Sequence, residues 1–218
     1  MTKSEHAIIT IEISMPELPE PPSIEDDLFS TQEDWWNNAR INWSPSTWDL
    51  YASGFKEAAD TLVDKVEKRE LTQDTIVYPT LFLYRQYIEL KLKIVIQALR
   101  KLQGVGSEFP KGHNIANLWT DAEKLIIKNF PENSKTALIE TGRLIQEFSN
   151  VDPKSTAFRY PVDNSGDPSL PGMTHINLRN VRDVMAKIAM LLNGTYMMTE
   201  GHLQLHSEMK HESREDWH

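Results

Sequence analysis

The segment from Pro79 to Leu102 constrains the fold of this chain more than any other. Placed on a helix at about 100° per residue, its large apolar side chains cover more than half of the circumference. The middle of this apolar arc consists of Tyr84, Ile88, Leu92, Val95, Leu99 and Leu102, and Leu83, Tyr87, Leu90 and Ile94 widen it. Because such a wide arc has to be covered from several sides, the segment predicts the central helix of a bundle.

Four further segments have helical spacing. They run from Ser46 to about Glu70, from about Asn114 to Phe130, from about Asn133 to Ser149, and from about Ile176 to Asn193. Ser46 with Asp49 resembles a capping box at the first start. Residues 151–172 are typical of a loop, in which FRYPVDNSGD predicts a small hairpin within 155–170. The chain is therefore predicted to be all-α, a single bundle of about five helices within residues 31–195.

Both ends of the chain are predicted to lie outside this bundle. Residues 1–30 contain AIITIEISMP, whose alternation predicts a short β-strand, and PELPEPPSIEDD, which is typical of an extended linker. Residues 196–218 are expected to form an acidic, solvated tail. Its His202 and His206 are spaced as a metal pair on a helix would be, but a solvated segment explains them better. No metal and no cofactor are therefore predicted.

Charge and composition bound the class of protein. The formal net charge is −9, yet residues 1–40 hold nine carboxylates against two basic side chains, residues 200–218 hold five against two, and the residues between them sum to +1. A local basic patch could therefore still bind phosphate. Because the chain has no cysteine, no apolar run of membrane-spanning length and no signal-peptide pattern, we expect a cytoplasmic protein without a membrane partner.

Four of the six tryptophans stand within fourteen residues, and they are Trp35, Trp36, Trp43 and Trp48. One interpretation is that they anchor the N-terminal arm onto the bundle by burying aromatic area. The other is that they form a surface that stacks on bases or docks a protein partner.

The central segment also carries charged side chains of two kinds. Arg85, Glu89, Lys93 and Arg100 fall into one narrow stripe, at a spacing typical of ion pairs along a helix. Lys91 instead projects into the apolar arc, where an unpaired ammonium is unfavourable. We expect it to lie inside the bundle with a carboxylate or phenolic oxygen as partner. The alternative is that its stem follows neighbouring rings and places the ammonium in water.

Three short motifs follow one another along the chain. They are ELKLK in the central helix, GHNIANLW at the start of the next, and FRYPVD in the loop before the last helix. In this order they resemble the HEPN superfamily of all-helical domains, over about Pro79 to Leu192. The resemblance implies binding of RNA or a nucleotide, in some members as a ribonuclease toxin, within toxin–antitoxin, antiviral-defence or stress systems of bacteria. It also implies a homodimer.

The chain departs from this family in one respect. Ribonuclease members typically carry an arginine followed roughly four to six positions later by a histidine, near the start of a late helix. No histidine follows Arg179 or Arg182 at that spacing. Ribonuclease activity is therefore expected only through a non-standard site that needs no metal.

The residues that could bind RNA or a nucleotide within this resemblance are Arg85, Glu89, Lys91, Lys93, His113, Arg159 and Tyr160. His113 stands at a helix start, where anions are favoured, and Arg159 could form a two-pronged contact with phosphate or carboxylate. We expect both to face a common groove near Arg85 and Lys93. The alternative is that His113 caps its helix and Arg159 ties the loop to an acidic neighbour.

Three functions are compatible with these patterns. The first is RNA or nucleotide binding by a HEPN-like bundle. The second is a non-catalytic subunit that docks a protein partner through the four tryptophans. The third is a metal-dependent hydrolase built on the tail histidines. The sequence contains neither a glycine-rich phosphate loop nor a serine nucleophile elbow.

Overall fold

A computed structural model of the chain describes residues 20–44 and 46–215, with side chains described as far as Lys210. The chain divides into two units, Met1–Ile41 and Asn42–His218. In the first unit, a short 3-10 helix, η1, spans Trp35–Asn37. The β-strand predicted within residues 7–16 lies outside the described residues.

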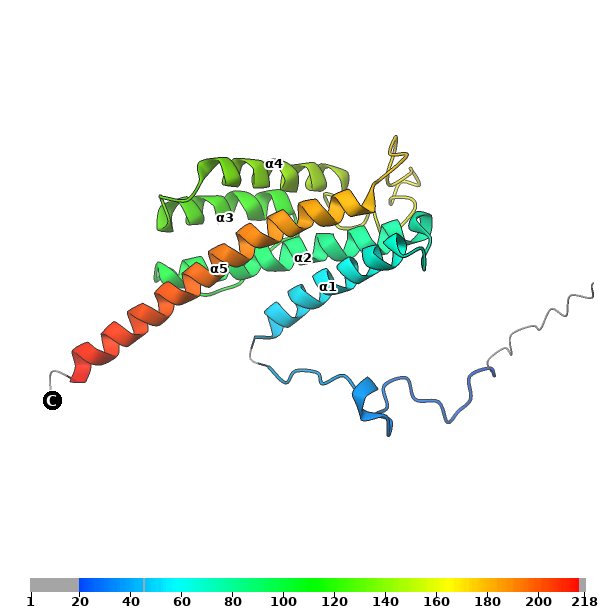
Figure 1. The fold of residues 1–218 in the computed structure, drawn as a ribbon, viewed down its shortest axis with the longest axis horizontal. Coiled ribbons are helices and arrows are strands. Elements are labelled where there is room, and N and C mark those ends of the chain that lie inside the picture. The colour runs from blue at the N-terminus through cyan, green and yellow to red at the C-terminus, as the bar shows by residue number, and fades with distance from the viewer. Residues whose placement is uncertain (1–19, 45, 216–218) are drawn as a thin grey trace, which may run out of the picture. The chain divides into compact units, whose positions relative to one another are not determined.

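The described residues of the second unit contain five α-helices (Figure 1). They are α1 (Thr47–Glu67), α2 (Gln73–Leu102), α3 (Ile115–Asn129), α4 (Lys135–Val151) and α5 (Leu178–Glu215). The described residues contain no strand, so the predicted all-α class is confirmed. None of the helices in the described ranges combines the length and the apolarity needed to span a membrane.

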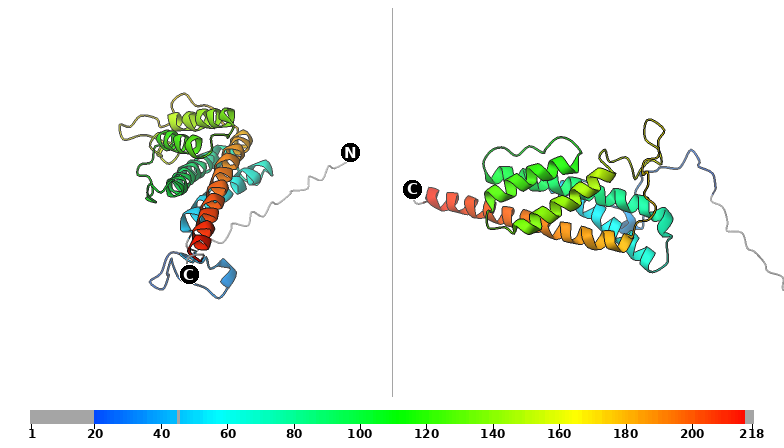
Figure 2. Two further views of the ribbon diagram at one scale, coloured as in Figure 1. Left: turned by 90° about the vertical axis from the view of Figure 1, so that its left-hand side faces the viewer. Right: turned by 90° about the horizontal axis from the view of Figure 1, so that it is seen from above.

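The core lies around α2. This helix packs against α1, α3 and α5, and α4 covers the far side of α3 (Figures 1 and 2). Tyr84, Ile88, Leu92 and Leu99 of the predicted apolar arc are completely buried. Removing large apolar side chains from water is the main favourable term in folding, and α2 therefore organises the bundle as its pattern predicts.

Two helix starts differ from the predicted ones. The helix α2 begins at Gln73 rather than near Pro79, and the amides of Thr75 and Ile76 bond the carbonyl of Thr72. Ser46 makes no side-chain cap on α1, and Asp49, the other half of the predicted capping box, instead accepts a hydrogen bond from Lys91. The starts of α3 and α4 do carry side-chain caps, which Asn114 and Ser134 provide.

Where a hairpin was predicted, the loop before α5 forms a single antiparallel bridge between Val162 and Pro168. The Asp163 amide bonds the Asp167 carbonyl at 2.9 Å, and the Ser169 amide bonds the Pro161 carbonyl at 3.0 Å. Pro168 has no amide hydrogen to donate, which limits the pairing on this side. The loop therefore turns as predicted but contains no β-ladder.

The last helix continues well past Asn193, where the sequence predicted its end. Gly194 and Gly201 lie inside α5, although glycine lowers helix stability by about 0.5–1 kcal/mol relative to alanine. Burial of Thr195 and Thr199 against the bundle, and the ring of His202 at 5.5 Å from that of Phe130, stabilise these turns. Tertiary packing thus outweighs two weak helix formers.

Candidate functional site

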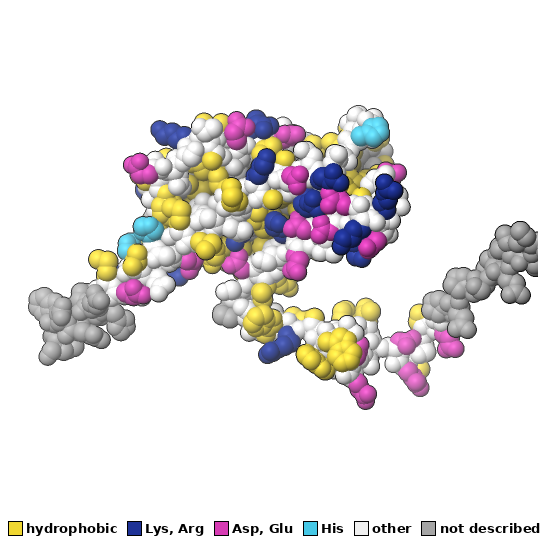
Figure 3. Space-filling view, in the orientation of Figure 1, with side chains coloured by type: hydrophobic (Ala, Val, Ile, Leu, Met, Phe, Trp, Pro, Cys, Tyr) yellow, Lys and Arg dark blue, Asp and Glu magenta, His cyan; other side chains and the backbone are white. Residues whose placement is uncertain are grey.

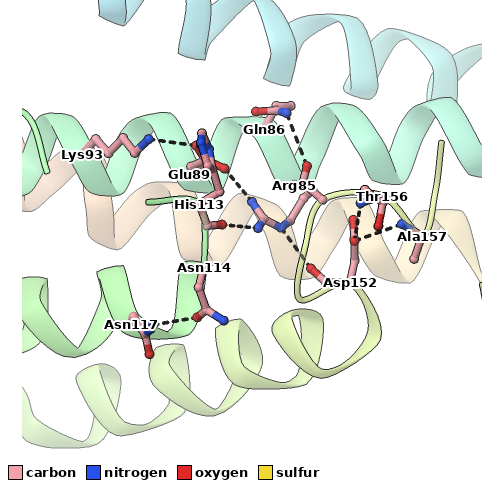
Figure 4. A network of polar contacts seen from close by, with 11 residues as sticks. Arg85, Gln86, Glu89, Lys93, His113, Asn114, Asn117, Asp152, Thr156 and Ala157 are labelled. Atoms are coloured by element: carbon pink, nitrogen blue, oxygen red, sulfur yellow. Dashed lines mark hydrogen bonds and ion pairs between the residues drawn. The ribbon is translucent and has the colours of Figure 1, made fainter. Parts of the chain in front are cut away.

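Four ionisable side chains meet between the middle of α2 and the start of α3 (Figure 4). Arg85, Glu89 and Lys93 are four residues apart along α2 and therefore share one face of it, and His113 immediately precedes the N-cap of α3. The three α2 residues are 0%, 3% and 7% exposed. We call these four residues the Glu89 cluster.

Arg85 ties three segments of the chain together. Its Nη1 donates to Glu89 Oε2 at 3.1 Å, its Nη2 donates to the carbonyl of His113, and its Nε donates to the carbonyl of Asp152 at 3.4 Å. The guanidinium is completely buried, and its planar fork of donors suits several fixed acceptors. Arg85 therefore fixes the start of α3 and the end of α4 on α2 and does not present its charge at the surface.

Glu89 is the acceptor at the centre of the cluster. Its Oε1 accepts a hydrogen bond from Lys93 Nζ at 2.9 Å and lies 2.8 Å from His113 Nδ1. Burial acts to raise the pKa of Glu89, but the hydrogen bonds from Lys93, His113 and Arg85 outweigh burial and hold the pKa below its ordinary value. Glu89 is thus ionised at neutral pH, and with Arg85 and Lys93 the cluster carries a net charge of +1 before His113 is counted.

His113 is the only member of the cluster that is open to solvent, with its side chain 75% exposed. Glu89 orients the ring, and the tautomer with its proton on Nδ1 fits a carboxylate partner. In that tautomer Nε2 is free to accept a proton. Asn114, not His113, caps α3, because the Asn114 side chain accepts from the Asn117 amide at 3.0 Å. The capping role predicted as the alternative for His113 is therefore wrong.

Asp152, which the sequence analysis did not single out, organises the loop beside the cluster. It is 1% exposed, and its Oδ1 accepts from the amides of Thr156 and Ala157 at 2.7 and 3.0 Å (Figure 4). Its other oxygen, Oδ2, has no hydrogen-bond partner among the described residues. An aspartate followed by Pro-Lys-Ser-Thr is a common turn signal and could have indicated this role.

Lys91 lies elsewhere, between α1, α2 and α5. It is 6% exposed, its Nζ is 2.9 Å from Asp49 Oδ1, and it stands 4.6 Å from the centre of the Tyr196 ring. The prediction of a buried lysine with a carboxylate partner is confirmed. A polar hollow of about 420 Å³ opens beside it, lined by Ser53, Lys56, Glu57, Asp60, Thr61, Asp64, Tyr87, Lys91 and Asn193.

Arg159 and Tyr160 lie in the loop that follows Asp152. The Arg159 guanidinium stands 5.7 Å from the ring centre of Phe82 and 5.4 Å from that of Tyr160, which is 55% exposed. No carboxylate among the described residues pairs with Arg159, so the predicted tie to an acidic neighbour is not seen. No hydrogen bond, ion pair or ring contact in the described part joins Arg159 to the Glu89 cluster, and the common groove with His113 stays a prediction.

The four tryptophans belong to both units. Trp35 and Trp36 of the first unit lie edge to face, with ring centres 6.3 Å apart, and are 75% and 70% exposed. In the second unit, Trp48 stacks on Phe109 at 4.0 Å, and Trp43 is 58% exposed. Anchoring of the arm by these residues stays a prediction.

A scan against models of protein families, a search of curated proteins and a search of solved structures found no match to this chain. Among the side chains that the structure describes, in residues 20–44 and 46–210, no three His, Asp or Glu gather closely enough to hold a metal ion. Two of the three motifs meet in the Glu89 cluster, since ELKLK contains Glu89 and Lys93 and GHNIANLW contains His113. Arg159 of FRYPVD lies in the loop before α5, over the rings of Phe82 and Tyr160.

Proposed function

We propose that this chain is a HEPN-like helical domain that binds RNA or a nucleotide at the end of α3 that carries His113. The observation that supports the proposal is the solvent-exposed imidazole of His113, whose inner nitrogen is held by the buried carboxylate of Glu89. Such a pairing fixes the ring and directs its chemistry through the outer nitrogen.

The surroundings of His113 favour an anion. The start of α3 presents the positive end of the helix dipole, and the Glu89 cluster beneath the ring has a net charge of +1. Lys111 precedes His113 in the same loop and is exposed. A phosphate at this position would meet donors and meet no unpaired carboxylate of the cluster.

The same geometry defines what chemistry the domain can perform. An imidazole held at Nδ1 by a carboxylate can take up a proton at Nε2, as a general base does. Cleavage of RNA by this domain would start with His113 Nε2 removing the proton of a ribose 2′-hydroxyl. The 2′-oxygen then forms a bond to the adjacent phosphorus, giving a 2′,3′-cyclic phosphate, and the bond from phosphorus to the 5′-oxygen breaks. The leaving 5′-oxygen takes a proton from water, so these steps need no metal.

Binding of a fluorescently labelled single-stranded RNA, and of a nucleotide, at low salt tests the proposal. We expect affinity to fall as salt rises, and His113→Ala to weaken binding about tenfold, with only a modest fall in melting temperature from the lost hydrogen bond to Glu89. His206→Ala, which removes another exposed histidine, on α5 and outside the Glu89 cluster, is the matched control and should bind as the wild type does.

Arg159→Ala provides a second test on the same preparation. Since this exposed guanidinium stands over two rings and forms no ion pair within the described residues, its loss should weaken RNA binding with little change in melting temperature. A clear loss of stability with unchanged affinity would assign Arg159 a structural role. A wild-type protein that binds neither RNA nor a nucleotide at low salt would overturn the proposal.

The exposed tryptophans favour a second candidate, a non-catalytic subunit that docks a protein partner. Trp35, Trp36 and Trp43 each expose more than half of their surface, and tryptophan is enriched at the centres of protein interfaces. Co-purification of a second protein that protects residues 20–44 from proteolysis, and that is lost from a Trp35→Ala/Trp36→Ala variant, would place this function first.

A further inference from the structure

One side of α5 is apolar and uncovered by the bundle. Along this side lie Lys187, Met190, Gly194, Met197, Met198, Gly201, Leu205 and Glu208, which we call the α5 outer face. Met190 and Met197 are 74% and 73% exposed, and Leu205 is 56% exposed. Figure 3 shows apolar side chains at intervals along this helix.

The spacing of these residues confines them to one stripe. They recur at intervals of three, four and seven residues, so their directions span about 100° of the helix. The opposite side of α5 packs into the core through Met185, Ile188 and Leu192. Most of the α5 outer face therefore points away from its own bundle, while Met197 and Gly201 border an open hollow that they share with Lys101 of α2. The last turns of α5 extend past the ends of the other helices (Figures 1 and 2).

The glycines of this face are not required by close packing within the bundle. A Cβ atom added at Gly194 or Gly201 would meet no atom within 4 Å. Gly142 of α4 differs, because a Cβ there would collide with the Trp119 indole. Two glycines seven residues apart, in a helix that does not require them, leave room for another backbone to approach closely.

The α5 outer face is also self-complementary, because residues at equal distances before and after its centre match in type. From a centre between Met197 and Met198, Gly194 mirrors Gly201, Met190 mirrors Leu205, and Lys187 mirrors Glu208. We propose that a second copy of this chain binds here, with the two α5 helices antiparallel about a twofold axis between Met197 and Met198.

Charge decides the direction of this pairing. The antiparallel arrangement places Lys187 of each copy beside Glu208 of the other, whereas a parallel one would place Lys187 beside Lys187 and Glu208 beside Glu208. Like charges opposite one another are unfavourable, and a twofold axis makes both contacts identical. The contact runs over about 30 Å of helix, from Lys187 to Glu208. It goes beyond the proposed RNA site and requires no RNA.

The oligomeric state over a range of protein concentrations tests the proposal. Sedimentation equilibrium of the full chain should show a reversible dimer, and Met197→Glu should weaken it by about tenfold or more, since this exposed side chain lies at the axis. Ile139→Glu, at an exposed apolar residue of α4, is the matched control and should dimerise as the wild type does. A monomer at all concentrations, or a dimer indifferent to Met197→Glu, would refute the proposal.

Reversing the charges tests the partners across the interface. Lys187→Glu and Glu208→Lys should each weaken the dimer by about two- to tenfold, and the double variant should restore it. Failure of the double variant to recover would show that these two residues do not face one another.

The absence of cysteine from the chain allows a test of direction. Under mild oxidation, a mixture of Met190→Cys and Leu205→Cys proteins should form a disulfide-linked mixed dimer, while either protein alone should not. Met198→Cys, next to the axis, should cross-link with itself. Efficient self-linking of Leu205→Cys would indicate parallel helices and overturn the proposal. RNA binding is measured separately, so the failure of one proposal leaves the other intact.

Discussion

At the scale of single residues, the bundle depends on buried charges that are fully paired. Glu89 accepts from Lys93, contacts His113 and receives one arm of Arg85, while Lys91 is paired with Asp49 on another side of α2. Breaking a buried pair by removing one partner is strongly unfavourable, because the other charge is left in a medium that solvates it poorly. The side chain of Glu89 is 4% exposed, whereas that of Asp49 is 30% exposed and reaches water. We therefore expect loss of a charged partner to cost more stability at Glu89 than at Asp49.

Glu89→Gln should lower the free energy of unfolding by about 3–5 kcal/mol, because Arg85 and Lys93 would remain buried with no counter-charge. Urea denaturation followed by circular dichroism measures the change. Glu140→Gln, which breaks an exposed pair with Arg143, is the control and should change the free energy by less than about 0.5 kcal/mol. Equal effects of the two substitutions would contradict the buried role of Glu89.

Lys91→Met should change the free energy of unfolding by less than about 1 kcal/mol. Methionine retains the volume of the side chain, and Asp49, whose side chain is 30% exposed, remains hydrated. Asp49→Ala should be more harmful, by about 2–3 kcal/mol, since it leaves the ammonium of Lys91 buried. The same denaturation experiment checks the order, and a larger loss for Lys91→Met than for Asp49→Ala would reverse it.

At the scale of elements, the helices differ in how closely they approach their neighbours. Gly142 allows α4 to contact the indole of Trp119 on α3, and an added Cβ would lie 3.2 Å from Trp119 Cδ1 and closer still to its Nε1. Gly54 of α1 is also helical but faces open space. Helix propensity favours alanine at both positions. A loss of stability on replacing either glycine with alanine would therefore indicate a steric clash with a neighbouring side chain.

Gly142→Ala is expected to destabilise the bundle by about 1–3 kcal/mol, because the tryptophan or the helix has to move. Gly54→Ala is expected to stabilise it by about 0.5–1 kcal/mol. Thermal and urea unfolding of both variants check the prediction, and a stabilising Gly142→Ala would show that α3 and α4 lie farther apart than in this structure.

At the scale of the whole molecule, ion pairs between distant segments make stability depend on pH. Hydrogen bonds from Arg182 and then Arg179 of α5 lower the pKa of Glu67 at the end of α1. The pKa of Glu89 is also lowered, as described above. The folded state therefore binds fewer protons near pH 4 than the unfolded chain does, and protonation favours unfolding.

Stability should thus be constant above about pH 5.5 and should fall as the pH drops below about 4.3, the ordinary pKa of glutamate, toward the lowered values of the folded state. Urea denaturation at a series of pH values between 3 and 7 measures this slope. Glu67→Gln should make the slope shallower, because its contribution no longer titrates. An unchanged slope would show that the link between α1 and α5 contributes nothing to acid sensitivity.

The sequence by itself determined what depends on local spacing. The wide apolar arc of residues 79–102 predicted the central helix, four more periodic segments predicted its neighbours, and the direction of Lys91 predicted a buried partner. These predictions succeeded because a helix repeats every 3.6 residues and buries one face. Residues three or four positions apart therefore show which side of the helix is buried, without knowledge of the rest of the fold.

The tertiary structure alone decided which distant groups meet. The partner of Lys91, the carbonyl of Asp152 that accepts from Arg85, and the continuation of α5 beyond Gly194 all depend on segments far apart along the chain. The stripe of Arg85, Glu89 and Lys93 has a spacing equally suited to a solvated surface. It is buried because the start of α3 and the loop after α4 cover it, and burial is a property of the assembled helices rather than of any one of them.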